Sequence, residues 1–137
     1  MILPQFYTDD IIKRAILEDI NYVDVASDYL ISEEQRNEAY FVSKADGVLC
    51  GIDVAMRVFE LLDDSFTAKV YMHDGDKVKK GDLIAEFSGK TTLLLKGERT
   101  ALNLLQHMSG IATATAKAVK LCEGTKASIA DTRKTLP

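Results

Sequence analysis

Cysteine and proline are scarce in this sequence, and long apolar runs are absent. Cys50 and Cys122 lie far apart and match no metal-binding spacing, so we expect reduced, buried thiols in a cytoplasmic protein. The only prolines are at positions 4 and 137, which leaves no proline-rich linker between them. The apolar runs are too short to cross a bilayer. These absences argue against a disulfide-stapled miniprotein and a membrane-spanning chain.

Positive charge is also limited. The chain has 17 Lys and Arg residues against 21 Asp and Glu residues, which gives a formal net charge of −4. It therefore lacks the overall positive field of a non-specific nucleic-acid binder. The N-terminus has no basic stretch and soon reaches Asp9 and Asp10, so we expect no signal peptide. Any anion that this chain binds must be held by a local cluster of cations.

The sequence does contain an ordinary globular mixture of 137 residues, 47% hydrophobic and 28% charged. This is enough for one domain, or for one small domain and a piece of another. Thr8 is a candidate N-cap, with Asp9 and Asp10 in the first turn of a helix that carries an apolar stripe. That stripe consists of Ile11, Ile12, Ala15 and Ile16.

The next segments alternate between strand and helix patterns. Ala39–Ser43 favours a strand, and Gly51–Leu62 has apolar residues on one helical face. From Phe66 the pattern predicts strands, separated by glycine-containing turns. The expected strands are Thr67–Tyr71, Leu83–Phe87 and Thr91–Leu95, and the turns are at Asp74-Gly75-Asp76 and Gly81-Asp82.

A long helix is expected to begin after Gly97 and to end near Gly124, with small residues that permit close packing. Ala127–Ala130 then has no polar alternation, as in a strand buried on both faces. A parallel βα pattern starts here, so we expect the chain to be the N-terminal part of something larger.

The first candidate site is Asp131-Thr132-Arg133-Lys134, directly after this expected strand. Ligands bind outside the carboxyl ends of strands in α/β folds. Arg133 offers a planar fork for a carboxylate or phosphate, and Lys134 adds a compact charge. The alternative is a solvated strand end in which Asp131 pairs with Arg133 or Lys134, and the residues alone leave both open.

The second candidate is Lys96-Gly97-Glu98-Arg99, placed at the expected start of the long helix, where backbone N–H groups favour anions. From the residues alone, a surface role for Arg99 is favoured.

The third candidate, Asp74–Leu83, is expected to form a glycine-bounded turn with Val78 and Leu83 tucked inside, as in biotinyl and lipoyl carriers. It has no lysine after a methionine, so we expect a structural turn. His73 and His107 lack partners at metal-ligand spacing, and we expect no metal site.

Two long segments carry a resemblance to a known family. Glu98–Thr113, followed by Asp131–Pro137, resembles the quinolinate phosphoribosyltransferases. Supporting stretches are Asp46–Gly51, Arg57-Val58-Phe59 and the two glycine-containing turns, so that the resemblance extends from about Glu18 to Pro137.

The resemblance implies an α/β fold in two parts. Residues 1–103 would form an α+β sandwich domain with an antiparallel sheet and helices, and residues 104–137 a linking helix and the first strand of an incomplete α/β barrel. It implies a cytoplasmic pentosyltransferase of NAD biosynthesis that moves phosphoribosyl from phosphoribosyl pyrophosphate, with Mg²⁺, to quinolinate. The products are nicotinate mononucleotide, CO₂ and pyrophosphate.

The resemblance also implies roles for individual residues. Thr132, Arg133 and Lys134 would line the barrel mouth and bind substrate, with Lys134 also catalytic. Arg99 would bind substrate in the site of its partner in a homodimer. Asn21 and Val23 stand where the family usually has glycines, and the remaining barrel strands are not in these 137 residues. We therefore expect residues 1–137 alone to be inactive.

Two alternatives stay open. One is the molybdenum-transport-associated paralogue of the same family. The other is a non-catalytic biotinyl- or lipoyl-like carrier or dimerisation module.

Overall fold

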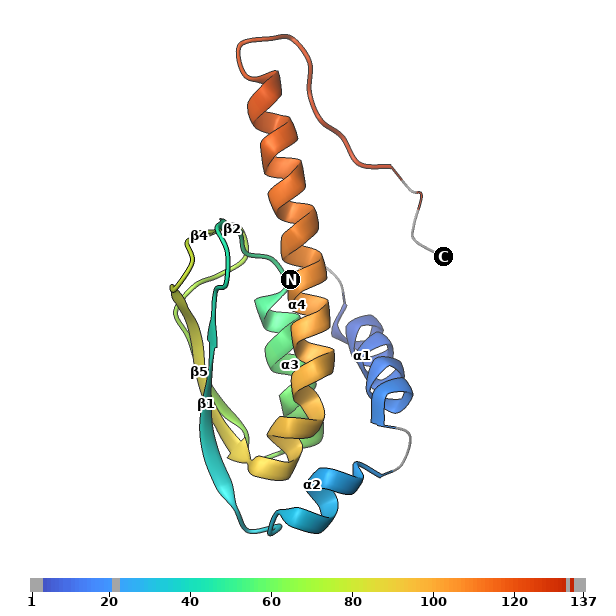
Figure 1. Ribbon diagram of the computed structural model, residues 1–137. Coiled ribbons are helices and arrows are strands. Elements are labelled where there is room, and N and C mark those ends of the chain that lie inside the picture. Colours follow the sequence, from blue (N-terminus) through green and yellow to red (C-terminus); the bar gives the residue numbers. More distant parts are fainter. Residues whose placement is uncertain (1–3, 21–22, 133, 135–137) are drawn as a thin grey trace.

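An antiparallel sheet forms one side of the molecule (Figure 1). The computed structural model describes residues 4–20, 23–132 and 134. The strands β1 (Arg36–Val42), β5 (Leu83–Lys90) and β3 (Thr67–Val70) pair in the order β1-β5-β3. A second, two-stranded sheet joins β2 (Gly47–Val48) to β4 (Lys77–Val78). The antiparallel sheet expected from the sequence is therefore confirmed.

Within the described ranges, four helices pack behind this sheet in two layers (Figure 1). The helices α3 (Ile52–Leu62) and α4 (Thr91–Cys122) lie against one face of the sheet, and α1 (Gln5–Ile20) and α2 (Val25–Leu30) cover the far side of that pair. The other face of the sheet carries Tyr40 and Glu86, and no described helix covers it.

The core centres on Phe59 of α3, which is 1% exposed. Its ring lies 5.0 Å from that of Phe87 and 5.3 Å from that of Phe66, measured between centroids. A Cβ atom at Gly97 would lie 2.8 Å from the Phe59 ring, so glycine is what lets α4 pass this close. Aromatic packing therefore joins the sheet to both central helices.

Several local expectations are confirmed. The helix expected over Gly51–Leu62 is α3, and the strands expected at 39–43, 67–71 and 83–87 correspond to β1, β3 and β5. Gly75 and Gly81 both have φ of 96°, the left-handed conformation that their turns require. In the turn between them Val78 is buried, but the expectation that Leu83 is also tucked inside is wrong, because Leu83 is exposed.

The expected start of the first helix is also wrong. α1 begins at Gln5, and Thr8 is a buried residue inside it rather than its N-cap. The backbone N–H of Tyr7 already donates to the Pro4 carbonyl, so the first turn forms directly after the proline. Of the expected stripe, Ile12 is buried whereas Ile11 is exposed.

The segment Thr91–Leu95 is helical, not a strand, and α4 begins at Thr91. Leu94 is buried on the same side as Ala101 and Leu105, so packing against the core outweighs the strand preference of two threonines. The expectation that Lys96-Gly97-Glu98-Arg99 opens the helix is therefore wrong. These residues lie inside α4, and Arg99 faces no helix N-terminus.

After α4 ends at Cys122, the chain turns at Gly124 and runs back in the open (Figure 1). The expected buried strand at Ala127–Ala130 is not formed, and Ile129 is 47% exposed. A strand needs neighbours to pair with its backbone groups, and no described strand lies beside this segment. The expected boundary at residues 103 and 104 falls within α4 and stays a prediction.

Asp63 fastens the end of α3 to the end of β5. Its buried carboxylate accepts from the Ser65 N–H (2.9 Å), the Ser65 hydroxyl (2.6 Å) and the Lys90 N–H (2.8 Å). Burial raises the pKa of Asp63, but the hydrogen bonds from Ser65 and Lys90 outweigh it and hold the pKa below the ordinary value of 3.8.

We expect Asp63→Asn to lower the free energy of unfolding by about 2 kcal/mol at pH 7, because the amide presents N–H groups to donors. A lowered folded-state pKa means that the carboxylate stabilises the fold above pH 3.8 and that this contribution is lost as the pH falls through the lowered value. Urea unfolding at pH 7 and at pH 3 should show that Asp63→Asn lowers the free energy of unfolding less at pH 3 than at pH 7. The exposed neighbour supplies the control, Asp64→Asn. A deficit equal at both pH values would contradict the role given to the carboxylate charge.

Candidate functional site

Arg99 extends from the N-terminal third of α4 toward α1. Its Nη1 atom lies 2.7 Å from Oδ1 of Asp19, near the end of α1. The side chain of Arg99 is 73% exposed, whereas that of Asp19 is 23% exposed. The guanidinium is thus tethered at one nitrogen and otherwise faces solvent.

Arg99 differs in this respect from the other arginines that the structure describes. Arg57 donates through Nε and Nη2 to Asp9, both at 2.9 Å, and through Nη1 to Glu60. Arg14 uses two nitrogens on Asp10, and Arg36 uses two on Ser65. Among the described arginines, only Arg99 engages a single nitrogen. It therefore retains Nε and Nη2 for an incoming carboxylate or phosphate.

Lys96 lies one helical turn before Arg99 and pairs with Asp28 of α2. Both side chains of this pair are largely shielded from solvent. Ser27 donates to the Asp24 carboxylate at 2.6 Å, and the Asp24 N–H donates to Asp28 at 3.1 Å. Two cations of α4 thus hold α1 and α2. Sequence reasoning placed Lys96 and Arg99 in one candidate segment but missed their partners Asp28 and Asp19, which lie too far away in sequence for a local pattern to indicate them.

The second group of expected site residues lies at the other end of the chain. Thr132 and Lys134 are exposed, and the Lys134 N–H lies 3.3 Å from the Thr132 hydroxyl. Arg133 is outside the described residues. Within the described ranges, Arg99 makes no hydrogen bond or ion pair with Thr132 or Lys134, and Asp131 makes no ion pair with Lys134. This chain alone does not bring the two groups together.

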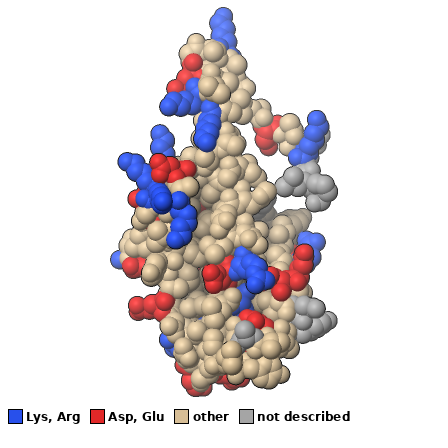
Figure 2. Space-filling view, in the orientation of Figure 1, with Lys and Arg blue, Asp and Glu red and all other residues tan. Residues whose placement is uncertain are grey.

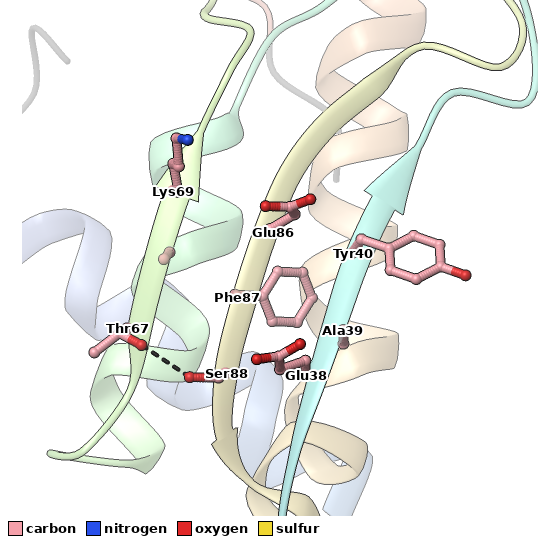
Figure 3. Close-up of a pocket in the computed structure, with 9 residues that line it drawn as sticks. Glu38, Ala39, Tyr40, Thr67, Lys69, Glu86, Phe87 and Ser88 are labelled. Carbon is pink, nitrogen blue, oxygen red and sulfur yellow. Dashed lines mark hydrogen bonds between the residues drawn. The ribbon is translucent and has the colours of Figure 1, made fainter.

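The hollow on the open face of the sheet is unsuited to anions (Figure 3). It is lined by Glu38 and Glu86, whose carboxylates stand between β1 and β3, against one cation, Lys69. Thr67 and Ser88 share a hydrogen bond of 2.9 Å at its edge. Two carboxylates against one ammonium would repel a dicarboxylate or a pyrophosphate.

A larger groove of about 870 Å³ lies between β1, β2 and α4. Its lining is mostly apolar, and its charged residues, Lys44, Asp46, Glu98 and Lys117, balance one another. Figure 2 shows further basic side chains on the upper left of the view, around β2 and β4. There the carboxylates of Asp46 and Asp82 accept from the N–H groups of Lys80 and Lys79. Among the described side chains, neither the groove nor the surface around β2 and β4 offers an exposed guanidinium with unused donors, as Arg99 does.

The segments that carry the resemblance also have structural roles. Thr113 of α4 accepts a hydrogen bond from the Val48 N–H at 2.9 Å, and Ser109 accepts one from the Cys50 N–H at 3.0 Å. A Cβ atom at Gly47 would lie 2.7 Å from the Thr113 hydroxyl oxygen, so this close approach requires glycine. Cys50 and Cys122 are free and half-buried, and burial raises the pKa of Cys50. The segment 46–51 and α4 therefore lock each other in place.

Within the described ranges, no group of three or more His, Cys, Asp or Glu side chains is placed to hold a metal ion. His73 and His107 are exposed. None of the described helices combines the length and apolar character needed to cross a membrane.

Known relatives match along almost the entire chain. It is 40% identical over 127 residues to a probable nicotinate-nucleotide pyrophosphorylase of Bacillus subtilis, covering 93% of this chain and 44% of that protein. A mitochondrial quinolinate phosphoribosyltransferase of Nicotiana tabacum is 36% identical over 135 residues, covering 98% and 38%. The crystal structure of NadC from Streptococcus pyogenes superposes with a TM-score of 0.94 at 37% identity, covering 100% of this chain and 49% of that one.

The chain thus spans less than half the length of these relatives. A family model described as quinolinate phosphoribosyl transferase, N-terminal domain, matches residues 24–109. That match includes Lys96, Arg99 and the segment 46–51, which the structure places on α4 and beside it. The resemblance stated from the sequence is therefore confirmed, and this chain belongs to the quinolinate phosphoribosyltransferase family.

Proposed function

We propose that this chain is the N-terminal half of an enzyme that transfers phosphoribosyl from phosphoribosyl pyrophosphate to quinolinate with loss of CO₂. The observation that carries the proposal is the superposition of all of this chain on about half of NadC, together with relatives named for this reaction. The product would be nicotinate mononucleotide, a precursor of NAD.

In this proposal Arg99 binds a carboxylate of quinolinate or a phosphate oxygen. Its Nε and Nη2 atoms make no hydrogen bond to any described residue, and this planar edge fits two oxygens at once. Each charge-assisted hydrogen bond would contribute about 1.5–3 kcal/mol once water is excluded.

Thr132, Arg133 and Lys134 would form the other part of the site. With barrel strands beside it, the segment 127–130 would gain the pairing that it lacks here, and the polar cluster would stand at the strand's carboxyl end. Lys134 would place a compact positive charge against the departing pyrophosphate or the substrate carboxylates.

We further propose a homodimer in which Arg99 enters the partner's site. Two observations support it: Arg99 points into solvent, and it has no contact with Thr132 or Lys134 within the described residues. Such sharing would make the dimer necessary for activity.

Mg²⁺ would accompany phosphoribosyl pyrophosphate and ease departure of the pyrophosphate. The described side chains form no cluster that fits a metal ion, so we assign the metal no residue of this chain and no step. We also propose a cytoplasmic location. The names of the relatives do not decide it, because the Nicotiana tabacum relative is named as mitochondrial.

The test uses two proteins: the 137-residue chain, and a complete enzyme in which this chain continues into a barrel half. The barrel half comes from the chain's own gene or from fusion to the corresponding half of the Bacillus subtilis relative. We expect quinolinate-dependent release of pyrophosphate and CO₂ from the complete enzyme and none from the 137-residue chain, because the barrel residues are missing from it.

Product formation from quinolinate separates this function from that of the molybdenum-transport-associated paralogue. An intact-mass measurement that shows a biotin or lipoyl adduct would instead favour the carrier alternative. Turnover by the 137-residue chain alone would contradict the proposal that the barrel half completes the site.

A further inference from the structure

We infer that Asp19 is a positioning residue for Arg99, and that it orients the guanidinium so that the Nε–Nη2 edge faces an incoming anion. The inference rests on the proposed function of Arg99. The pair is formed across 80 positions of sequence, between the end of α1 and the N-terminal third of α4, at 2.7 Å.

The first step is the anchoring of Asp19. α1 is fixed to α3 by the two hydrogen bonds between Arg57 and Asp9, each 2.9 Å long, and Ile12 of α1 is fully buried. The Asp19 side chain is itself only 23% exposed. The carboxylate is therefore the shielded member of the pair, carried by a helix that is anchored to α3, whereas the long Arg99 side chain is the exposed member.

The second step concerns what such a pair can do. An exposed ion pair adds little to fold stability, because solvent screens it and two side chains lose freedom. A ligand that must immobilise a free arginine loses affinity to that ordering. Asp19 orders the guanidinium in advance through Nη1 alone and leaves the opposite edge available. Its main effect is thus expected on substrate binding, not on folding.

The opposite possibility is that Asp19 occupies Arg99 as a competitor of the substrate carboxylate. The two possibilities differ in sign. If Asp19 positions Arg99, its removal raises KM for quinolinate; if it competes, its removal lowers KM.

The test is steady-state kinetics of the complete enzyme carrying Asp19→Ala. We expect KM for quinolinate to rise roughly three- to tenfold, with kcat within about twofold and an unchanged melting temperature. Asp10→Ala, which removes an exposed ion pair with Arg14 on the same helix, is the matched control and should leave KM unchanged. In an Arg99→Ala background, Asp19→Ala should change KM no further, as a double-mutant cycle requires for residues that act through one another.

A readout independent of activity is the Arg99 Nε–Hε resonance of the 137-residue chain. Its heteronuclear NOE should fall in Asp19→Ala and stay unchanged in Asp10→Ala. A lowered or unchanged KM, or an Asp19→Ala effect that persists without Arg99, would overturn the positioning role while leaving the proposed function intact. A wild-type complete enzyme without quinolinate-dependent activity would overturn both.

Discussion

An equal mixture of Arg99→Ala and Arg133→Ala subunits is expected to recover about a quarter of wild-type activity, although each variant alone loses activity at least about 100-fold. The loss follows from removing a charged donor that faces the anionic substrate. The recovery follows from two-fold symmetry, since each mixed dimer has one site with both defects and one with neither. Equal mixing makes about half of the dimers mixed, and each of those has one intact site.

The experiment unfolds and refolds the two complete variant enzymes together and follows nicotinate mononucleotide formation. Each variant refolded alone is the control, and native mass spectrometry counts the mixed dimers. Absence of recovery despite mixed dimers would show that Arg99 does not serve the partner's site.

Phe59→Ala is expected to lower the free energy of unfolding of the 137-residue chain by about 4 kcal/mol. The side chain is 1% exposed and stacks on Phe66 and Phe87, so its removal leaves a cavity between the sheet, α3 and α4. The loss is large because α4 cannot easily move in to fill the cavity, being held by Ser109 and Thr113 to the segment 46–51.

Urea unfolding followed by circular dichroism measures this loss, and Phe59→Leu keeps it measurable if the alanine variant does not fold. The leucine variant should be destabilised by about 1–2 kcal/mol, since it restores most of the volume. Tyr40→Ala removes an exposed aromatic residue of β1 and should change stability by less than about 1 kcal/mol. Equal effects at positions 40 and 59 would contradict the assignment of Phe59 to the centre of the core.

The local spacing of apolar residues was sufficient to predict secondary structure wherever a segment packs one regular face against the core. In α3 the apolar residues recur at helical spacing and are buried, and in β1 and β5 the alternation of Tyr40 with Phe41 and of Glu86 with Phe87 matches exposure. The positive φ angles at Gly75 and Gly81 likewise follow from residue type alone.

The same spacing predicted the wrong secondary structure where contacts with residues distant in sequence determine it. Thr91–Leu95 has strand propensity, yet it joins α4 because Leu94 and Ala101 share a buried helical face against α3 and the sheet. Ala127–Ala130 has the composition of a buried strand, yet it forms none, because no described strand lies beside it to pair with.

The candidate site also has a part that the sequence indicated and a part that only the structure decided. The residues themselves marked Lys96–Arg99 and Asp131–Lys134 as candidate segments, and the resemblance to the family gave Arg99, Thr132, Arg133 and Lys134 their expected roles toward an anionic substrate. Only the tertiary structure decided that Arg99 lies inside a helix, that one of its nitrogens is held by Asp19, and that the rest of its fork faces solvent. The physical reason is that an ion pair between residues 80 positions apart depends on how α1 packs on α4, which no local periodicity encodes.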